Sequence, residues 1–503
     1  MARYGTFRYG DGTLYGSSET PNLLWALEID WDGDGKFSGA NEARYMVDLV
    51  VTRGREFFLR DDGKGFMRMQ VGTADAVLEN VDGRFDPFNA ASPLYPYITP
   101  GRQFRLRVKD GADGTFYPVM KGRIGNLRPV SGVDQVMIPM VDGTQALIDE
   151  TITMAIQVDA QVDDLMHLVL DEVGWPADER AIDASTDTLP YWWADGVSAW
   201  DALNELAEGV LGTFFVAADG KATFVSRSHS AAEAVTLNQE ELKKEIDLPQ
   251  PWDNIRNQIE VAVRTRVPAP DVELWRLREA TAVGAGETVE VWAEFTHDGE
   301  SVPASVVTDP AATTDYTANT AADGGGSDLT ADFTVTVTPF GRRAKVETTN
   351  GSATDGFITL EKIRGTALTL PDVATKKRED AASQGAQGVR SFILESDWLQ
   401  DGNLAESFAE YLKTNLSLVR AFPEAQIEAR PELQFALDLF VRTGINIPAK
   451  GIANVFQAAR IEHRWLTSNG QAVLTTARFE PVPPAVLQWT FPVKMGEESY
   501  FAF

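Results

Sequence analysis

Cysteine is absent from the 503 residues, and histidine occurs only four times. A chain without cysteine has no disulfide cross-links and no thiolate chemistry. This is compatible with folding in a reducing compartment. The histidines, His167, His229, His297 and His463, are far apart in the chain, and no pair has the spacing of a metal-binding motif.

Positive charge is also scarce. The chain has 45 Lys and Arg residues against 74 Asp and Glu, which gives a formal net charge of −29. A sequence-independent DNA binder needs clustered cations to neutralise phosphates, and docking on an anionic membrane needs them as well. The composition argues against both classes of protein.

Long apolar runs are missing too. The longest, such as residues 209–218, are too short to span a bilayer. The first ten residues lack the apolar stretch of a signal peptide. We therefore expect a soluble chain, or part of a soluble assembly, with no membrane insertion of its own.

Catalytic motifs are not found either. The sequence has no Gly-x-Ser-x-Gly elbow, no His-Glu-x-x-His, no phosphate-binding P-loop and no dinucleotide fingerprint. Because the chain has so many carboxylates, acidic pairs occur by chance, and a glycosidase dyad cannot be recognised from sequence. We expect the protein not to be an enzyme.

Strand patterns dominate what is present. The length predicts three to five domains. In residues 1–145, Phe104, Leu106 and Val108 alternate with polar residues, and Asp-Gly turn signals recur. These patterns predict an antiparallel β-barrel or sandwich.

Residues 146–250 predict an α+β insertion domain. Ser198-x-x-Asp201 resembles a capping box, and an apolar stripe follows as far as Gly212, so a helix is expected there. Asp219-Gly220 then predicts a hairpin between strands 213–218 and 221–227.

The rest of the chain predicts further β-structure. We expect a second β-domain at 251–371 with an immunoglobulin-like insertion at about 272–350, and an α+β or β-barrel domain at 372–485. Within them, 308–328 and 371–388 are expected to be loops, and Asn403-x-x-Glu406 is expected to cap a helix. Asn469-Gly470 predicts a hairpin, and 486–503 is a C-terminal tail. The predicted fold class is therefore mainly β and multidomain, with barrel-like domains and an α+β insertion.

One segment has the pattern of a metal site. Asp30, Asp32 and Asp34 take positions 1, 3 and 5 of what could begin a calcium loop. Position 12 is Asn41, however, and the acidic residue falls one place late, at Glu42. The alternative is an acidic turn in which the carboxylates bond nearby backbone amides. No cofactor is predicted apart from this candidate Ca²⁺ site.

A second segment, residues 78–97 followed by Pro100-Gly101-Arg102, resembles a signature of the tail-tip proteins of long-tailed bacteriophages, the minor tail or baseplate hub proteins. The family pattern runs Leu-x-Asn-x-Asp-Gly-Arg-[Phe/Tyr]-x-Pro-x-Asn-x-x-Ser-Pro-Leu-Tyr, and nearly every position matches. The acidic turn at 29–37 is similar to a recurrent feature of the same family.

Three later segments agree with the family in order. Residues 199–227 resemble its helix-plus-hairpin insertion, residues 313–365 its immunoglobulin-like insertion and return strand, and residues 459–481 its closing β-domain. The resemblance thus extends over most of the chain.

The resemblance implies a homotrimeric hub of barrel-like domains at the tail tip of a virion, made and assembled in the host cytoplasm. Its partners would be the distal tail ring protein, the tape-measure protein and receptor-binding or fibre proteins. The hub would close the tail tube and open for genome ejection, with DNA only passing through its lumen. An acidic lumen would let DNA slide, although acidity also serves solubility alone.

Four residues of the signature are candidate interface residues. Arg84 follows an expected turn and is available for a carboxylate across a strand or a subunit contact. Leu94, Tyr95 and Tyr97 form an apolar-aromatic stretch that is a candidate anchor. Packing within the domain is the alternative for both groups.

Two other functions remain open. The first is a tail-associated enzyme that degrades the cell wall, such as a glycoside hydrolase. The second is a carbohydrate-binding adhesin, for which Tyr191-Trp192-Trp193 is the candidate platform. The alternative for these aromatics is packing under the following helix or at a subunit interface.

Overall fold

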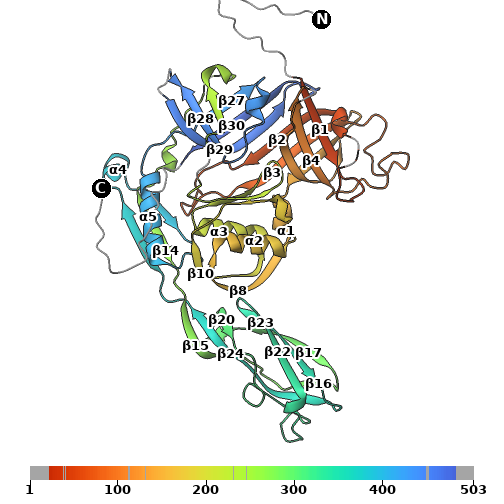
Figure 1. Ribbon diagram of the computed structural model, residues 1–503, viewed down its shortest axis with the longest axis vertical. Helices are drawn as coiled ribbons and strands as arrows, with labels where there is room; N and C mark the ends of the chain where they lie inside the picture. Colours follow the sequence, from red (N-terminus) through yellow and green to blue (C-terminus); the bar gives the residue numbers. More distant parts are fainter. Residues whose placement is uncertain are drawn as a thin grey trace, which may run out of the picture.

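The computed structural model describes residues 22–482, except for residues 38, 40, 112–113, 131, 230–231, 245 and 449–451. The expected C-terminal tail at 486–503 lies outside the described residues. Strands make up 46% of the structure and helices 16%. The prediction of a mainly β, multidomain chain is therefore confirmed (Figure 1).

The largest element is a 12-stranded sheet, shown in red and blue in Figure 1. Its main path has the order β1 (Leu23–Ile29), β4 (Gln103–Asp110), β5 (Tyr117–Ile124), β7 (Gln135–Asp142), β3 (Gln70–Glu79), β2 (Met46–Gly54), β29 (Ile452–Trp465), β28 (Arg442–Ile447) and β13 (Val235–Asn238). The short β6 (Arg128–Pro129) pairs with β7, and β30 (Val473–Pro481) joins β29 to β27 (Glu424–Glu428). The described strands form no closed barrel.

The predicted alternation places the core of this sheet. Phe104, Leu106 and Val108 of β4 are fully buried, in one cluster with Leu27 and Ile29 of β1. The intervening Arg105 and Arg107 pair with Glu28 on the other side of the strand. Hydrophobic burial on one face and ion pairs on the other therefore set the register between β1 and β4.

Strand β2, from the N-terminal part of the described residues, pairs with β29, from their C-terminal part. Gly54 ends β2 with a φ of +105°, and a Cβ there would lie 2.1 Å from the carbonyl oxygen of Ala459. Only glycine allows this close approach. Arg53 extends the junction, since its guanidinium bonds Asp438 at 2.7 Å and the carbonyl of Val216 at 3.0 Å.

The α+β unit lies beside this sheet. Its elements are α1 (Thr144–Asp149), β8 (Thr151–Gln161), α2 (Val162–Glu172), β9 (Arg180–Ile182), β10 (Thr188–Ser198), α3 (Ala199–Gly209), β11 (Thr213–Val216) and β12 (Ala222–Val225), with 3-10 turns at Ala177–Glu179, Gln239–Glu241 and Trp252–Asn254. Its helices share one hydrophobic core with the C-terminal strands, in which Leu203 and Phe214 join Ile461 and Phe479.

Local signals in this unit are confirmed. The hydroxyl of Ser198 accepts a hydrogen bond from the backbone N–H of Asp201 and caps α3. The predicted hairpin forms between β11 and β12, with Gly220 at a φ of +89°. No helix in the part of the chain that the structure describes has the length and apolar character needed to cross a membrane.

A smaller three-stranded unit follows. β14 (Gln258–Val263) lies between β25 (Ala374–Glu379) and β26 (Ser391–Leu394), and α5 (Gly402–Leu416) packs on β14. Two expectations are wrong here. Residues 371–388 contain β25 and α4 (Ala381–Gln387), because an edge strand and a short surface helix carry the polar residues of a loop. The side chain that caps α5 is Asp401, not Asn403.

A β-sandwich projects at the lower end of Figure 1. One set of strands is β15 (Val267–Arg276), β16 (Thr281–Val283), β20 (Ala304–Val307), β21 (Tyr316–Asn319) and β24 (Gly356–Thr369). The facing set is β17 (Thr288–Glu294), β22 (Phe333–Phe340) and β23 (Arg343–Asn350), with a small ribbon of β18 (Thr296–His297) and β19 (Glu300–Ser301). β21 lies inside the expected loop 308–328, because its small polar residues hide a strand that pairs with β24.

Candidate functional site

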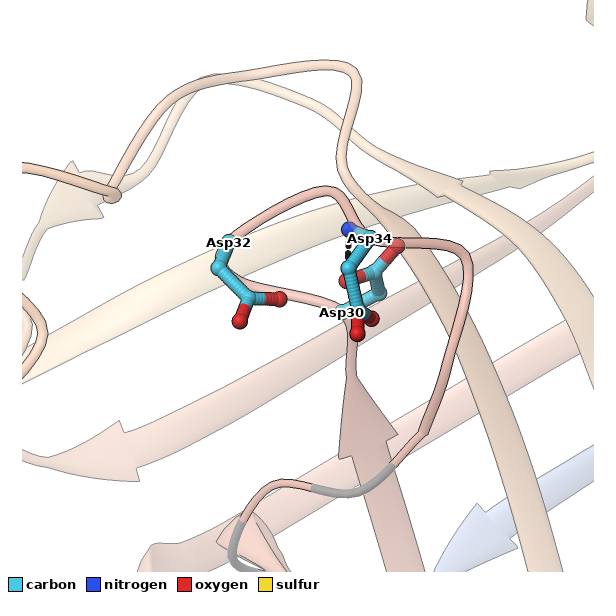
Figure 2. A group of neighbouring side chains, drawn as sticks. All are labelled: Asp30, Asp32 and Asp34. Carbon is cyan, nitrogen blue, oxygen red and sulfur yellow. Dashed lines mark hydrogen bonds between the residues drawn. The ribbon is translucent and has the colours of Figure 1, made fainter.

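The acidic turn follows β1 directly. The carboxylates of Asp30, Asp32 and Asp34 have oxygen atoms within 4.8 Å of one another. Figure 2 shows the three side chains on the turn. Among the residues that the structure describes, they form the one group of three or more acidic or histidine side chains close enough to share a metal ion. Asp30 is buried, whereas Asp32 and Asp34 are exposed.

Hydrogen bonds to the backbone organise this turn. The Asp30 carboxylate accepts the N–H groups of Gly33 at 2.9 Å, Asp34 at 3.1 Å and Gly35 at 2.9 Å. Asp34 accepts the N–H of Lys36 at 2.8 Å and pairs with its ammonium group, and these contacts hold the pKa of Asp34 below its usual value. This is the geometry of the acidic turn that was the alternative to a calcium loop.

The residues that would complete a calcium loop have other partners. Asn41 accepts the N–H of Leu27 at 2.9 Å and donates to the carbonyl of Trp25 at 2.8 Å, so it fixes the turn to β1. Glu42 is fully buried and pairs with Arg84. A bidentate carboxylate at the end of the loop is the usual anchor for Ca²⁺. Calcium binding by the three aspartates therefore stays a prediction.

Residues 80–102, here called the signature loop, form a dense hydrogen-bond network. Asn80 accepts the N–H of Phe85 at 2.8 Å, and Asp82 accepts the N–H of Arg84 at 3.1 Å. The hydroxyl of Ser92 donates to the carbonyl of Arg84 and accepts the N–H of Leu94. The polar residues of the sequence signature are thus the ones that shape the loop.

The four candidate interface residues fall into two groups. Arg84 and Leu94 are buried within the domain, and the carboxylate that Arg84 reaches is Glu42 of the same chain. Tyr95 and Tyr97, at 47% and 44% exposure, face outward, with a cis bond between Tyr95 and Pro96. Packing within the domain accounts for the first pair, and the second pair remains the interface candidate.

Two further residues of the loop were not singled out from the sequence. Val81 is 78% exposed and Phe88 is 91% exposed. The sequence contained a signal for both, because they are apolar residues that stand among polar, turn-forming residues. With Tyr95 and Tyr97, they give the signature loop four exposed apolar side chains on a tightly bonded frame.

The acidic turn and the signature loop contact each other through Arg102. Its Nε donates to the carbonyl of Tyr97 at 3.3 Å. Its guanidinium also lies against Gly33, where a Cβ would be 2.1 Å from Nη1. The acidic turn and the signature loop, two of the segments on which the family resemblance is based, are therefore one structural site.

Two of the three residues of the aromatic platform predicted for an adhesin are not on the surface, and the third, Tyr191, is half-buried. Trp192 and Trp193 are buried, and Trp193 packs edge-on against Trp398 at 4.9 Å. Arg266 lies over its ring at 5.2 Å, and Gly341 of the sandwich approaches it closely. Trp193 thus lies between the α+β unit and the sandwich. Both tryptophans share a hydrophobic cluster with residues of α3, the helix that follows them.

The histidines have separate partners in the structure. His463 is buried in β29, where burial lowers its pKa to about 3, and its Nδ1 lies 2.9 Å from the hydroxyl of Thr475. His229 contacts Asp183 at 2.7 Å, and His167 lies near Arg180. His463 is thus a neutral core residue, and the other three have separate partners, with His297 lying 3.6 Å from Asp298.

No family model matches the chain, and a search of curated proteins finds no match. Solved structures with some similarity include tail proteins and a component of a type VI secretion system from E. coli. The tail protein from Neisseria meningitidis MC58 is 11% identical with a TM-score of 0.49, over 90% of this chain and 96% of that one. The prophage MuSo2 43 kDa tail protein from Shewanella oneidensis is 11% identical with a TM-score of 0.49, over 92% and 99%.

Proposed function

We propose that the chain is a structural protein of a bacteriophage virion, the tail-tip or baseplate hub. In this role it would close the tail tube, link the distal tail ring protein to receptor-binding or fibre proteins, hold the end of the tape-measure protein and open for DNA passage. The main support for this proposal is the signature loop. The residues that match the family pattern form the hydrogen bonds that shape this loop.

The chemistry of the loop supports an assembly role. Buried Arg84 and its partner Glu42 fix the frame, while Val81, Phe88, Tyr95 and Tyr97 are exposed on it. Exposed aromatic side chains on a rigid frame lose little conformational entropy when they are buried by a partner. A protein surface is therefore the expected ligand of this loop.

The charge of the chain is consistent with a conduit for DNA. Three copies would carry three times the formal net charge of −29. An acidic lumen repels phosphate, so DNA would pass through without being held.

The mass of the purified protein in solution, measured by light scattering, tests the proposal. A species near three times 55.1 kDa, or a trimer that forms on adding the distal tail ring protein of the same phage, is expected. A chain that stays monomeric and free of the ring protein would overturn the hub proposal. Turnover of host cell-wall polymer by the purified protein would support the enzyme instead.

A further inference from the structure

A cavity of about 580 Å³ lies where three parts of the molecule meet. One wall comes from the long sheet and includes Phe440 and Arg442. Another comes from the α+β unit, around β12 and Arg227. The third comes from α5 and the segment after it, with Tyr411, Arg420 and Phe422. This volume is in the range of small-molecule binding sites.

Several of the residues that line the cavity are aromatic. The ring of Phe58 lies 5.3 Å from that of Phe66 and 5.4 Å from that of Phe422. Burial raises the pKa of Tyr411 to about 12, and the nearby Arg227 and Arg420 oppose this only in part, so its hydroxyl stays protonated. These residues offer an apolar surface and a neutral donor.

The charged side chains that line the cavity are cationic. No described residue that lines it is Asp or Glu, although the chain holds 74 of them. Two of its arginines are neutralised in place, because Arg55 pairs with Glu480 and Arg227 with Asp187. Glu480 and Asp187 therefore neutralise Arg55 and Arg227, and not the other arginines of the cavity.

The other two arginines bond only neutral groups among the described residues. Arg442 donates to the carbonyl of His229 at 2.6 Å, and Arg420 donates to the amide oxygen of Asn415 at 3.2 Å. Burial also lowers the pKa of Arg420. A half-buried guanidinium without a counter-ion is costly, and a carboxylate or phosphate that reaches it forms strong charge-assisted hydrogen bonds.

We infer that this cavity binds a small amphipathic anion. Its acidic head, a carboxylate or phosphate, pairs with Arg420 and Arg442, and its apolar body packs against Phe58, Phe66 and Phe422. Because the walls come from three units, the bound molecule contacts segments that are far apart in the chain. Binding therefore stabilises the folded chain as a whole and raises its unfolding temperature.

Titration calorimetry on the full chain tests this, with octanoate and phenyl phosphate as probes and octanol as the uncharged counterpart. We expect saturable 1:1 binding of an anionic probe and at least about tenfold weaker binding of octanol. The double variant Arg420→Gln/Arg442→Gln should bind the anion at least about tenfold more weakly and octanol as before. Arg123→Gln/Arg128→Gln, at exposed arginines outside the cavity, is the matched control and should bind like the parent chain.

A second variant keeps the arginines. Ser228 is exposed and lines the cavity, so Ser228→Trp fills the space without changing the charge. It should lose binding of both the anion and octanol while the unfolding temperature without ligand stays near that of the parent chain. Absence of saturable binding by either anionic probe, or equal affinity in the parent chain and Ser228→Trp, would overturn the inference.

Discussion

The guanidinium of Arg84 donates two hydrogen bonds to the carboxylate of Glu42, with Nη2 to Oε1 at 2.7 Å and Nε to Oε2 at 3.2 Å. Both side chains are buried, and the indole N–H of Trp31 reaches the same carboxylate at 3.3 Å. This pair joins the signature loop to the segment that follows the acidic turn. It also explains why Glu42 is not available as a calcium ligand.

Replacement of Arg84 should therefore destabilise the folded chain, and not only the signature loop. We expect Arg84→Met to lower the free energy of unfolding by about 3–5 kcal/mol, because it leaves the buried charge of Glu42 without a partner. Chemical denaturation measures this change. The double variant Glu42→Gln/Arg84→Met removes both charges and keeps an acceptor for Trp31, so it should recover part of the loss. A double variant no more stable than Arg84→Met would contradict this account.

Asp30 gives a prediction that separates the acidic turn from a metal site. Asp30→Ala should destabilise the chain by about 2 kcal/mol, because three backbone N–H groups lose their acceptor. Thermal unfolding in Ca²⁺ and in a chelator measures it, with Asp32→Ala as the control at an exposed carboxylate. If the hydrogen bonds from the backbone to Asp30 alone hold the turn, Asp30→Ala should lose the same stability in Ca²⁺ and in the chelator. A Ca²⁺-dependent rise in unfolding temperature that Asp32→Ala abolishes would instead make the three aspartates ligands.

Local features of the fold could be predicted from the sequence. The alternation of β4, the cap at Ser198 and the hairpins at Asp219-Gly220 and Asn469-Gly470 each depend on a few neighbouring residues. Such signals lie within a few consecutive residues of the sequence, so they can be recognised without knowledge of the fold. Local signals also account for the wrong prediction at β25. Charged residues are common both in loops and on exposed edge strands, so the local sequence does not distinguish the two.

Long-range features could not be predicted in this way. The pairing of Arg53 with Ile461 joins segments about 400 residues apart, and no local periodicity specifies such a register. The acidic turn was found, but the partner of Glu42 was not, since Arg84 is distant in sequence. The cavity was missed for the same reason, because Phe58, Arg227 and Arg420 meet only after folding.

His463 predicts how stability depends on pH. Burial, and to a lesser extent the charge of Arg53, lowers its pKa from 6.5 to about 3. As the pH falls below 6.5, His463 therefore binds a proton in the unfolded chain but stays neutral in the folded chain. The stabilisation is complete above pH 6.5 and is lost as the pH falls toward 3, by up to about 1.4 kcal/mol per pH unit.

The variant His463→Gln isolates this effect, because glutamine keeps a polar contact for Thr475 but does not titrate. Denaturation curves between pH 7 and pH 4 should show a shallower loss of stability for the variant than for the parent chain. Carboxylates titrate in both proteins, so only the difference between the two curves reports on His463. Parallel curves would show that this histidine is already protonated or exposed in the folded chain.

Tyr95 and Tyr97 carry the prediction for assembly. Both side chains are about half exposed, so Tyr95→Ala/Tyr97→Ala should change the stability of the monomer by no more than about 1 kcal/mol. If the signature loop is an interface, the same variant should weaken trimer formation or binding to the distal tail ring protein by about tenfold or more, since buried aromatic anchors dominate interfaces. Phe57→Ala, at a residue 54% exposed outside the loop, is the matched control. Sedimentation or light scattering over a range of concentrations measures the association, and equal association by both variants would place the interface elsewhere on the chain.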